Sequence, residues 1–335
     1  MAYCGNLFFS GLDLQPIKRP VSLSGNNYCI IMKQSLAIII TLMLLAGVST
    51  AQAYDIVVVK NGDEMPMAQV VRAFGDKLVH LLPARGVKSI EPHRFREIDI
   101  RRNPIKSAVE QEILASRPDL ILTLGRNALL AVRDISEIPI IYLLVVAPEI
   151  IIENRDNITG VNLEIPVKLQ FDELTRLLPR VRRIGVIYNT GHSAMEIQEA
   201  RQARADLQFV ALHAKSAREV PASLEELRGR VDLIWLLPDI IVTNPQILES
   251  YFLFSFENRV PVLAFSEKYL KSGAALVVTF DMAAMGEQAA VMAARILLGS
   301  PVSGVPPADI TRVKTIVNPT VARKLQLVIP EDASP

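Results

Sequence analysis

Five small or polar residues, numbered 189–193 (NTGHS), interrupt the chain directly after the apolar run 184–188 (IGVIY). A helical pattern begins immediately afterwards. Their amide and hydroxyl groups could donate hydrogen bonds to a small ligand and accept hydrogen bonds from it. The other interpretation is a turn in which Ser193 caps the following helix. The two interpretations are compatible, so the sequence leaves both open.

Similar residues follow the other apolar runs of the chain. In a parallel α/β sheet, ligands bind beyond the carboxyl ends of the strands, beside the first turns of the helices. We therefore expect one ligand site lined by residues from several strand ends. The candidates are Asn61, Thr123, Gly125, Arg126, Ala147, Asn189, Thr190, Ser193, Asp239, Ser266, Glu267 and Asp281.

The charges of two candidates, Asp239 and Arg126, suggest particular partners. Asp239 follows an apolar strand and a proline, where a lone carboxylate is costly without a hydrogen-bonding or charged neighbour. A ligand ammonium group or a buried pair within the protein would each serve. Arg126 could bind a ligand carboxylate through two parallel hydrogen bonds, or it could point into solvent.

Motifs of catalysis are absent from the sequence. It contains no G-x-G-x-x-G after a strand, no G-x-x-x-x-G-K-[ST], no G-x-S-x-G and no H-E-x-x-H. The four histidines, at positions 80, 93, 192 and 213, lack the spacing of metal ligands. We therefore expect a binding protein that is not an enzyme and that uses neither a cofactor nor a metal.

The apolar runs themselves predict the elements that position the candidates. They are short and continuous, which is typical of parallel strands covered by helices on both faces. A helix is expected over 103–118, with Asn103 as its N-cap and Pro104 in its first turn, and others over 192–207 and 281–298. The predicted strands are 55–59, 119–124, 138–146, 184–188, 232–237 and 260–265.

These units repeat in the same order. The segments DIVVVKNG, RPDLILTL and EIPIIYLLV of the first half resemble IGVIYNTG, RVDLIWLL and RVPVLAF of the second. The repetition predicts two Rossmann-like α/β lobes of one plan, joined by a hinge. The tail 271–335 belongs to neither repeat and reads as a helix, a loop, a strand and a short helix.

Residues 32–53 have the layout of a secretory signal peptide. Lys33 is followed by an apolar run 13 residues long, 36–48, and by Ala51-Gln52-Ala53. An uncleaved anchor helix is the alternative, although the apolar run is short for a membrane span. A signal peptide begins with its charged region, so we expect translation to start at Met32 and residues 1–31 to be a wrongly assigned upstream segment.

Composition narrows the class of protein further. Hydrophobic residues make up 50% and charged residues 21%, which is typical of folded domains with large cores. The net charge is +1 without a basic run, so no nucleic-acid partner is indicated. Both cysteines, Cys4 and Cys29, precede the predicted cleavage site. The mature chain therefore offers no thiol nucleophile, disulfide or thiolate metal site.

Segments across 54–330 resemble the ABC transporter substrate-binding family that includes tryptophan- and tyrosine-type binding proteins. The specific marks are ITGV at 158–161, LLP and RRIGVIYN around 177–189, and SGAAL with the helix that follows it. The resemblance implies the type I periplasmic-binding fold, with three crossings between the lobes. It also favours Asn189, Thr190, Ser193 and Asp239 as ligand contacts.

The function implied is that of a periplasmic, monomeric solute-binding protein that closes on a small polar ligand, such as an amino acid. It would deliver that ligand to an inner-membrane permease and its ATPase. A receptor of the same fold that feeds a membrane signalling protein, or a periplasmic enzyme, are the alternatives. The expected lobes are 54–160, completed by about 281–305, and 161–280, completed by about 306–330.

Overall fold

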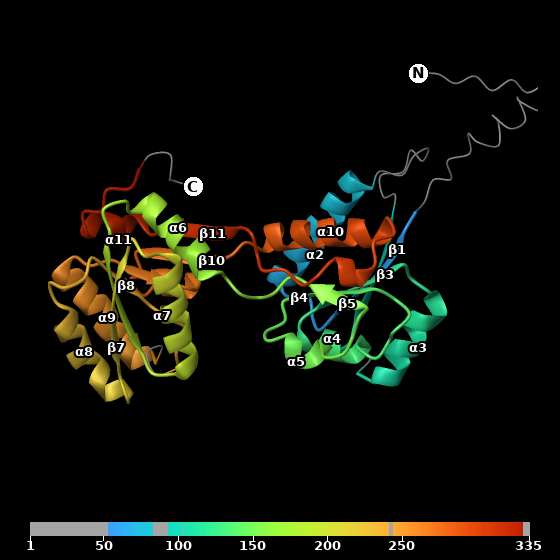
Figure 1. Cartoon of the computed structure of the whole chain (residues 1–335), viewed down its shortest axis with the longest axis horizontal. Coiled ribbons are helices and arrows are strands. Elements are labelled where there is room, and N and C mark those ends of the chain that lie inside the picture. The colour runs from blue at the N-terminus through green and yellow to red at the C-terminus, as the bar shows by residue number, and fades with distance from the viewer. Residues whose placement is uncertain (1–52, 83–92, 103, 241–243, 331–335) are drawn as a thin grey trace, which may run out of the picture. The chain divides into compact units, whose positions relative to one another are not determined.

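The computed structural model describes residues 53–82, 93–102, 104–240 and 244–330 (Figure 1). Two sheets form separate α/β lobes, as the sequence predicts. In the first lobe all strands are parallel, in the order β2-β1-β3-β4-β5. These strands are β1 (Asp55–Lys60), β2 (Arg94–Asp99), β3 (Leu120–Leu124), β4 (Ile140–Leu143) and β5 (Ile158–Gly160).

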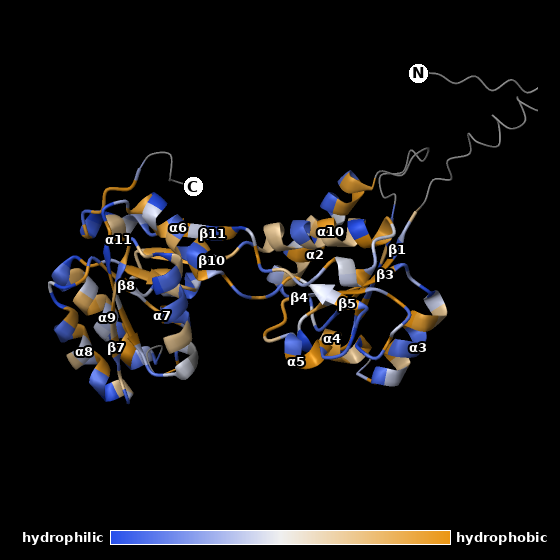
Figure 2. Cartoon of the chain, viewed as in Figure 1, coloured by the Kyte–Doolittle hydropathy of each residue, from blue (hydrophilic) through white to orange (hydrophobic). Residues whose placement is uncertain are grey.

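Helices cover both faces of the first sheet. Side chains of α2 (Met65–Leu81) and α10 (Met282–Leu297) form one core with alternate residues of β1, β3 and β4. The other face packs against α3 (Lys106–Ser116), α4 (Arg126–Val132) and α5 (Glu149–Ile152). Burial on both faces explains why these strands are continuous apolar runs (Figure 2).

The helices α2 and α10 lie side by side although more than 200 residues separate them (Figure 1). Small residues along α10 allow the close approach. A Cβ atom at Gly286 would lie 2.3 Å from the carbonyl oxygen of Val70, so only glycine fits there. The helix 281–298 expected from the sequence is therefore an integral part of the first lobe's core.

The second sheet has the order β11-β10-β9-β8-β6-β7, and only β11 is antiparallel. One face packs against α6 (Val167–Leu177), α7 (Gly191–Ala203) and α11 (Pro319–Lys324), the other against α8 (Val220–Leu227) and α9 (Pro245–Asn258). Its strands are β6 (Arg183–Tyr188), β7 (Gln208–His213), β8 (Leu233–Trp235), β9 (Val262–Ala264), β10 (Leu276–Phe280) and β11 (Val313–Val317). The short helices are η1 (Ala217–Glu219), η2 (Glu267–Leu270) and η3 (Val302–Gly304).

The two lobes share one plan, and one detail recurs at the atomic level. In each lobe an aspartate stands just before the third strand of that lobe, β3 or β8. Its carboxylate accepts a hydrogen bond from the backbone N–H at the start of the lobe's first strand, β1 or β6. Asp119 accepts from the Asp55 N–H at 2.8 Å, and Asp232 accepts from the Arg183 N–H at 2.8 Å. The repeats RPDLILTL and RVDLIWLL therefore correspond in structure as well as in sequence.

Three connections link the lobes along the chain. They run from β5 to α6, from β10 to α10, and from η3 to β11. Two of them are joined near the first lobe, where Val161 and Ala308 form a β-bridge and the Thr159 hydroxyl donates to the Val305 carbonyl at 2.6 Å. This connectivity matches the three crossings implied by the resemblance.

One predicted helix boundary is wrong. The helix expected over 103–118 begins at Lys106 and ends at Ser116, and its N-cap is Ile105. Pro104 therefore lies outside the helix. The cause is a turn in which the Arg102 N–H donates to the Asp99 carbonyl, after which Ile105 stays extended (φ −83°, ψ 109°). Asn103 itself lies outside the described residues.

The predicted upstream segment, most of the predicted signal peptide and both cysteines also lie outside the described residues. Within the part of the chain that the structure describes, no helix combines the length and the apolar character needed to span a membrane.

Candidate functional site

The polar residues after β6 surround the carboxylate of Asp239, which follows β8. Its Oδ2 atom accepts hydrogen bonds from the N–H groups of Asn189 and Thr190 at 2.9 and 3.0 Å. It also accepts from the hydroxyl groups of Ser193 and Thr190 at 3.0 and 3.3 Å. Asp239 is only 2% exposed. Four donors around one carboxylate oxygen make the loop 189–193 a fixed platform.

Sheet order explains why these two segments meet. The strands β6 and β8 are adjacent and parallel, so their carboxyl ends lie at the same edge of the sheet. Thr190 is also the N-cap of α7, because its Oγ1 accepts from the Ser193 N–H at 3.2 Å. The predicted turn is present, but the prediction that Ser193 caps the helix is wrong, because Thr190 is the cap and Ser193 lies within the first turn of α7. A ligand contact by the same residues stays a prediction.

The strand β7 adds a residue that sequence analysis did not place at this edge. His213 ends β7, is exposed, and its Nε2 atom lies 3.2 Å from the Asn189 carbonyl oxygen. Its ring packs edge-to-face against Tyr188, with centroids 5.3 Å apart. The Asn189 side chain donates to the Ala214 carbonyl at 2.7 Å. The apolar run FVAL at 209–212 was the available signal for this strand.

In the first lobe, five predicted contacts occupy or follow strand ends. Asn61 follows β1 and is half-buried. Gly125 lies between β3 and α4, where it is the N-cap of α4 and has a positive φ of 87°. Arg126 begins α4, is exposed, and makes no ion pair with any described residue. Thr123 differs from the rest because it lies inside β3, is fully buried, and its hydroxyl lacks a hydrogen-bond partner among the described residues.

The loop after β4 carries unusual backbone conformations. Leu144 and Ala147 have φ values of 59° and 47°, which are uncommon for residues other than glycine. Such conformations cluster at ligand-binding positions, where the surrounding structure imposes them. This observation supports Ala147 as part of a site, although it shows no ligand contact.

The remaining candidates have local structural roles. Glu267 is exposed and forms an ion pair with Lys314 at 2.9 Å. Ser266 precedes η2, and its carbonyl accepts from the Tyr269 N–H at 3.1 Å. Asp281 is the N-cap of α10 and accepts from the Ala284 N–H at 2.9 Å. The structure thus brings Asn189, Thr190, Ser193 and Asp239 together. It places Glu267, Ser266 and Asp281 at separate positions.

A cavity of about 260 Å³ lies at the carboxyl ends of β1 and β2, and most of its charged side chains form ion pairs. Lys60 binds both Asp63 and Glu97. Burial alone would lower the pKa of Lys60, but these hydrogen bonds raise it above its ordinary value. The guanidinium of Arg101 lowers the pKa of Asp99 to about 2. Charges neutralised in this way leave little to attract an ionic ligand.

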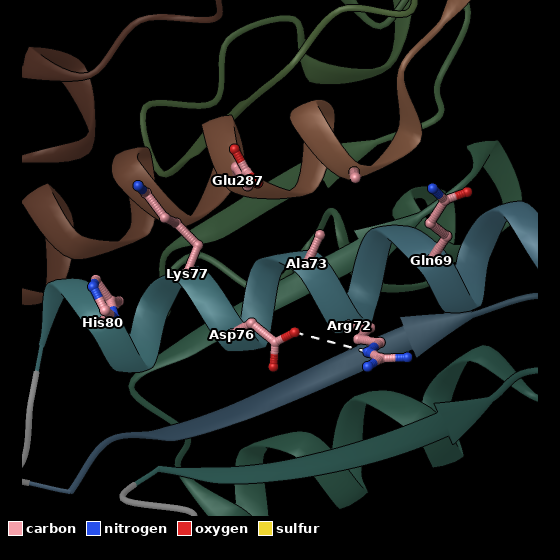
Figure 3. A pocket seen from close by; sticks show the side chains of 8 residues that line it. Gln69, Arg72, Ala73, Asp76, Lys77, His80 and Glu287 are labelled. Carbon is pink, nitrogen blue, oxygen red and sulfur yellow. Dashed lines mark ion pairs between the residues drawn. The ribbon is translucent and has the colours of Figure 1, made fainter. Parts of the chain in front are cut away.

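A second pocket, of about 440 Å³, lies on the outer face of α2 and α10 (Figure 3). Gln69, Arg72, Asp76 and Lys77 of α2 and Glu287 of α10 line it. The ion pair between Arg72 and Asp76 spans 3.8 Å and is highly exposed, so it contributes little to stability. This pocket contains none of the predicted contacts. Among the described residues, no group of three or more potential metal ligands was found.

A buried carboxyl group lies on α7, close to the candidate loop. The Oε2 atom of Glu196 is inaccessible to solvent and has no hydrogen-bond partner among the described residues. Burial, together with the charges of Glu164 and Glu199, raises its pKa to about 7. Glu164 belongs to the first connection between the lobes. Ionising Glu196 therefore costs free energy in the folded protein.

We expect this group to make stability fall with increasing pH. Its pKa is higher in the folded state than in the unfolded chain, so its contribution is complete below about pH 4.5 and is lost as the pH rises through about 7. The difference amounts to at most roughly 3 kcal/mol. Urea unfolding at pH 4.5 and pH 7.5 should show this loss in the wild type and a smaller one in Glu196→Gln. Equal losses in both proteins would contradict the assignment.

The chain is similar in sequence to a family of known proteins. Residues 76–334 match the model of a family described as ABC transporter substrate binding protein. A tyrosine-binding protein of Clostridioides difficile (strain R20291) is 23% identical over 236 residues, which are 67% of this chain and 68% of that protein.

Solved structures show the same fold. The ligand-free, open structure of CD0873, a substrate binding protein with adhesive properties from Clostridium difficile, has a TM-score of 0.65 and 20% identity, covering 84% of this chain and 97% of the other. An ABC transporter substrate-binding protein from Desulfitobacterium hafniense, in complex with Leu, has a TM-score of 0.50 and 12% identity, covering 82% and 88%. These proteins bind solutes, which agrees with the lack of catalytic motifs.

Proposed function

We propose a function from the premise that the chain belongs to the family of ABC transporter substrate-binding proteins. The protein is the solute-binding component of an ABC importer. Its two lobes close on a small ligand, and the closed form delivers the ligand to a membrane permease. The ligand selects the closed state by contacting the strand ends of both lobes, because only a ligand with higher affinity for that state can shift the equilibrium.

The observation that carries this proposal is the platform at residues 189–193. A loop held through four hydrogen bonds to Asp239 is pre-organised, so little conformational entropy is lost when a ligand binds to it. Polar side chains of this loop lie at the carboxyl edge of the sheet, where ligands of α/β proteins bind. The proposed contacts are the residues predicted from the sequence, with Asp239 positioning the loop.

The location and partner are part of the same proposal. The signal-peptide layout of residues 32–53 supports export to the periplasm, where a monomeric binding protein would meet the permease of the inner membrane. The ATPase of the transporter would act on the permease from the cytoplasm and would not touch this chain.

A thermal-shift screen of residues 54–335 against amino acids, sugars, purines and organic acids tests the proposal. A ligand at 100 times its Kd adds about 2.7 kcal/mol to the free energy of unfolding. For a chain of this length the melting temperature should rise by several degrees. Failure of every class to shift a well-folded sample would contradict the binding function.

A further inference from the structure

We propose that the ligand is a carboxylic acid with an apolar body and without an ammonium group. Its carboxylate pairs with Arg126, and its body contacts exposed apolar side chains at the strand ends. This inference rests on the proposed function and narrows the class of solute. It follows from two observations. Apolar side chains are exposed at the strand ends, and some of the charged side chains there already have partners.

Large apolar side chains are exposed just after four strands. Met65 follows β1, Val146 follows β4, Met195 follows β6 and Ile240 follows β8, with exposed fractions between 67% and 83%. All four strands are parallel to their neighbours, so Met65, Val146 and Ile240 lie near the carboxyl edges of their sheets. Met195 lies further along the chain, on the second turn of α7. Apolar side chains gathered at such an edge are typical of a surface that is covered by a ligand.

The acidic groups of the second lobe's edge are already engaged. The Oδ2 atom of Asp239 accepts four hydrogen bonds from the loop 189–193. The carboxylate of Glu267 pairs with Lys314. An ammonium group placed at this edge would lose its hydration and would compete with existing donors. Burying a charged group without a partner is strongly unfavourable.

Arg126 offers the opposite charge in the first lobe. It is the first residue of α4, directly after Gly125, and its guanidinium makes no ion pair with any described residue. The Met67 side chain lies 3.9 Å from the position that a Cβ atom of Gly125 would occupy, so the first turn of α2 lies beside the turn after β3. A planar guanidinium beside apolar side chains suits a carboxylate on an apolar body.

Matched ligand pairs test the missing ammonium group directly. Isothermal titration of the protein purified after expression of the full chain should compare 3-phenylpropionate with phenylalanine, and 4-methylpentanoate with leucine. Each pair differs only in the α-ammonium group. We expect at least one acid to bind roughly tenfold more tightly than its amino acid, because the acidic groups of the second lobe's edge already have partners.

Variants test the two contacts. Arg126→Met should weaken acid binding by about tenfold to a hundredfold, the size expected for a lost charged hydrogen-bonding partner. Ile240→Ser should weaken it by roughly tenfold through the loss of apolar contact. Arg94→Met, at the opposite end of the first sheet, and Leu298→Ser, after α10, are the matched controls and should leave binding unchanged.

Glu149 begins α5 after β4 and is an exposed carboxylate of the first lobe. Tighter binding of the amino acids, or a loss of their binding in Glu149→Gln, would overturn this inference while leaving the proposed function intact. The same holds if only sugars or purines bind in the thermal-shift screen, or if Arg126→Met binds the acid as the wild type does. If no compound of the screen binds, the proposed function fails and this inference fails with it.

Discussion

Replacing Gly160 by alanine should lower the free energy of unfolding by about 3 kcal/mol or more. Gly160 ends β5 and pairs with Tyr142 of β4. A Cβ atom there would lie 2.2 Å from the Tyr142 carbonyl oxygen and 2.5 Å from its Cγ atom. That carbonyl accepts from the Val161 N–H at 3.1 Å, so the backbone cannot move aside without losing a hydrogen bond.

The consequence extends to the first connection between the lobes. The Tyr142 hydroxyl donates to Asn162 at 2.7 Å, and the Asn162 amide donates to Asp309 in the third connection at 2.8 Å. A displaced β5 strand would disturb both connections. Chemical unfolding measured by circular dichroism checks the effect.

Gly191→Ala is the matched control for this variant. Gly191 begins α7 and has no neighbouring atom within 4 Å of an added Cβ. Alanine is a better helix former than glycine, so the control should be neutral or more stable by up to about 1 kcal/mol. Equal destabilisation of both variants would contradict the explanation by steric overlap at Gly160.

Replacing Asp239 by alanine is expected to cost about 3 kcal/mol of stability. The change removes the acceptor of two backbone N–H groups and two hydroxyl groups. The N–H groups of Asn189 and Thr190 then lack this partner, whereas the Thr190 and Ser193 hydroxyl groups lie 2.9 Å apart and can bond to each other. Each unsatisfied buried donor costs about 1–3 kcal/mol, and access of water to the half-buried loop reduces the sum. Ligand affinity should fall as well, because the loop 189–193 loses its anchor.

Glu267→Ala provides the comparison, since it removes a carboxylate from the same edge of the same sheet. Its exposed ion pair with Lys314 should contribute less than about 1 kcal/mol. Urea unfolding of the two variants beside the wild type gives both values. A loss in Asp239→Ala as small as that in Glu267→Ala would show that Asp239 does not hold the loop.

Much of the architecture follows from the sequence alone. Strands covered on both faces must be apolar throughout, so β1, β3, β4, β6, β8 and β9 are visible as uninterrupted runs. Their repetition in one order predicts two lobes of one plan, and the sheet order confirms it. The helix at 281–298 is equally clear, because alanine and methionine favour helices without help from distant contacts.

Edge strands were missed for a physical reason. The segment RFREID of β2 lies at the edge of its sheet and is largely exposed, and β7 at the edge of the second sheet is only partly buried. The strand β2 carries polar residues and lacks a continuous apolar signal. The strands β7 and β10 contain the apolar runs FVAL and LVV but were not among the predicted strands. The strand β5 has the sequence ITG, which contains a single large apolar residue, so no apolar run marks it.

For the site, the amino-acid sequence is enough to predict which polar residues stand at strand ends, since this depends only on where apolar runs stop. The tertiary structure decided which of them meet. Asp239 and Asn189 are 50 positions apart and touch because β6 and β8 pair side by side. It also decided that the Asp239 carboxylate serves the loop, because hydrogen-bond partners are set by three-dimensional proximity, which no local pattern encodes.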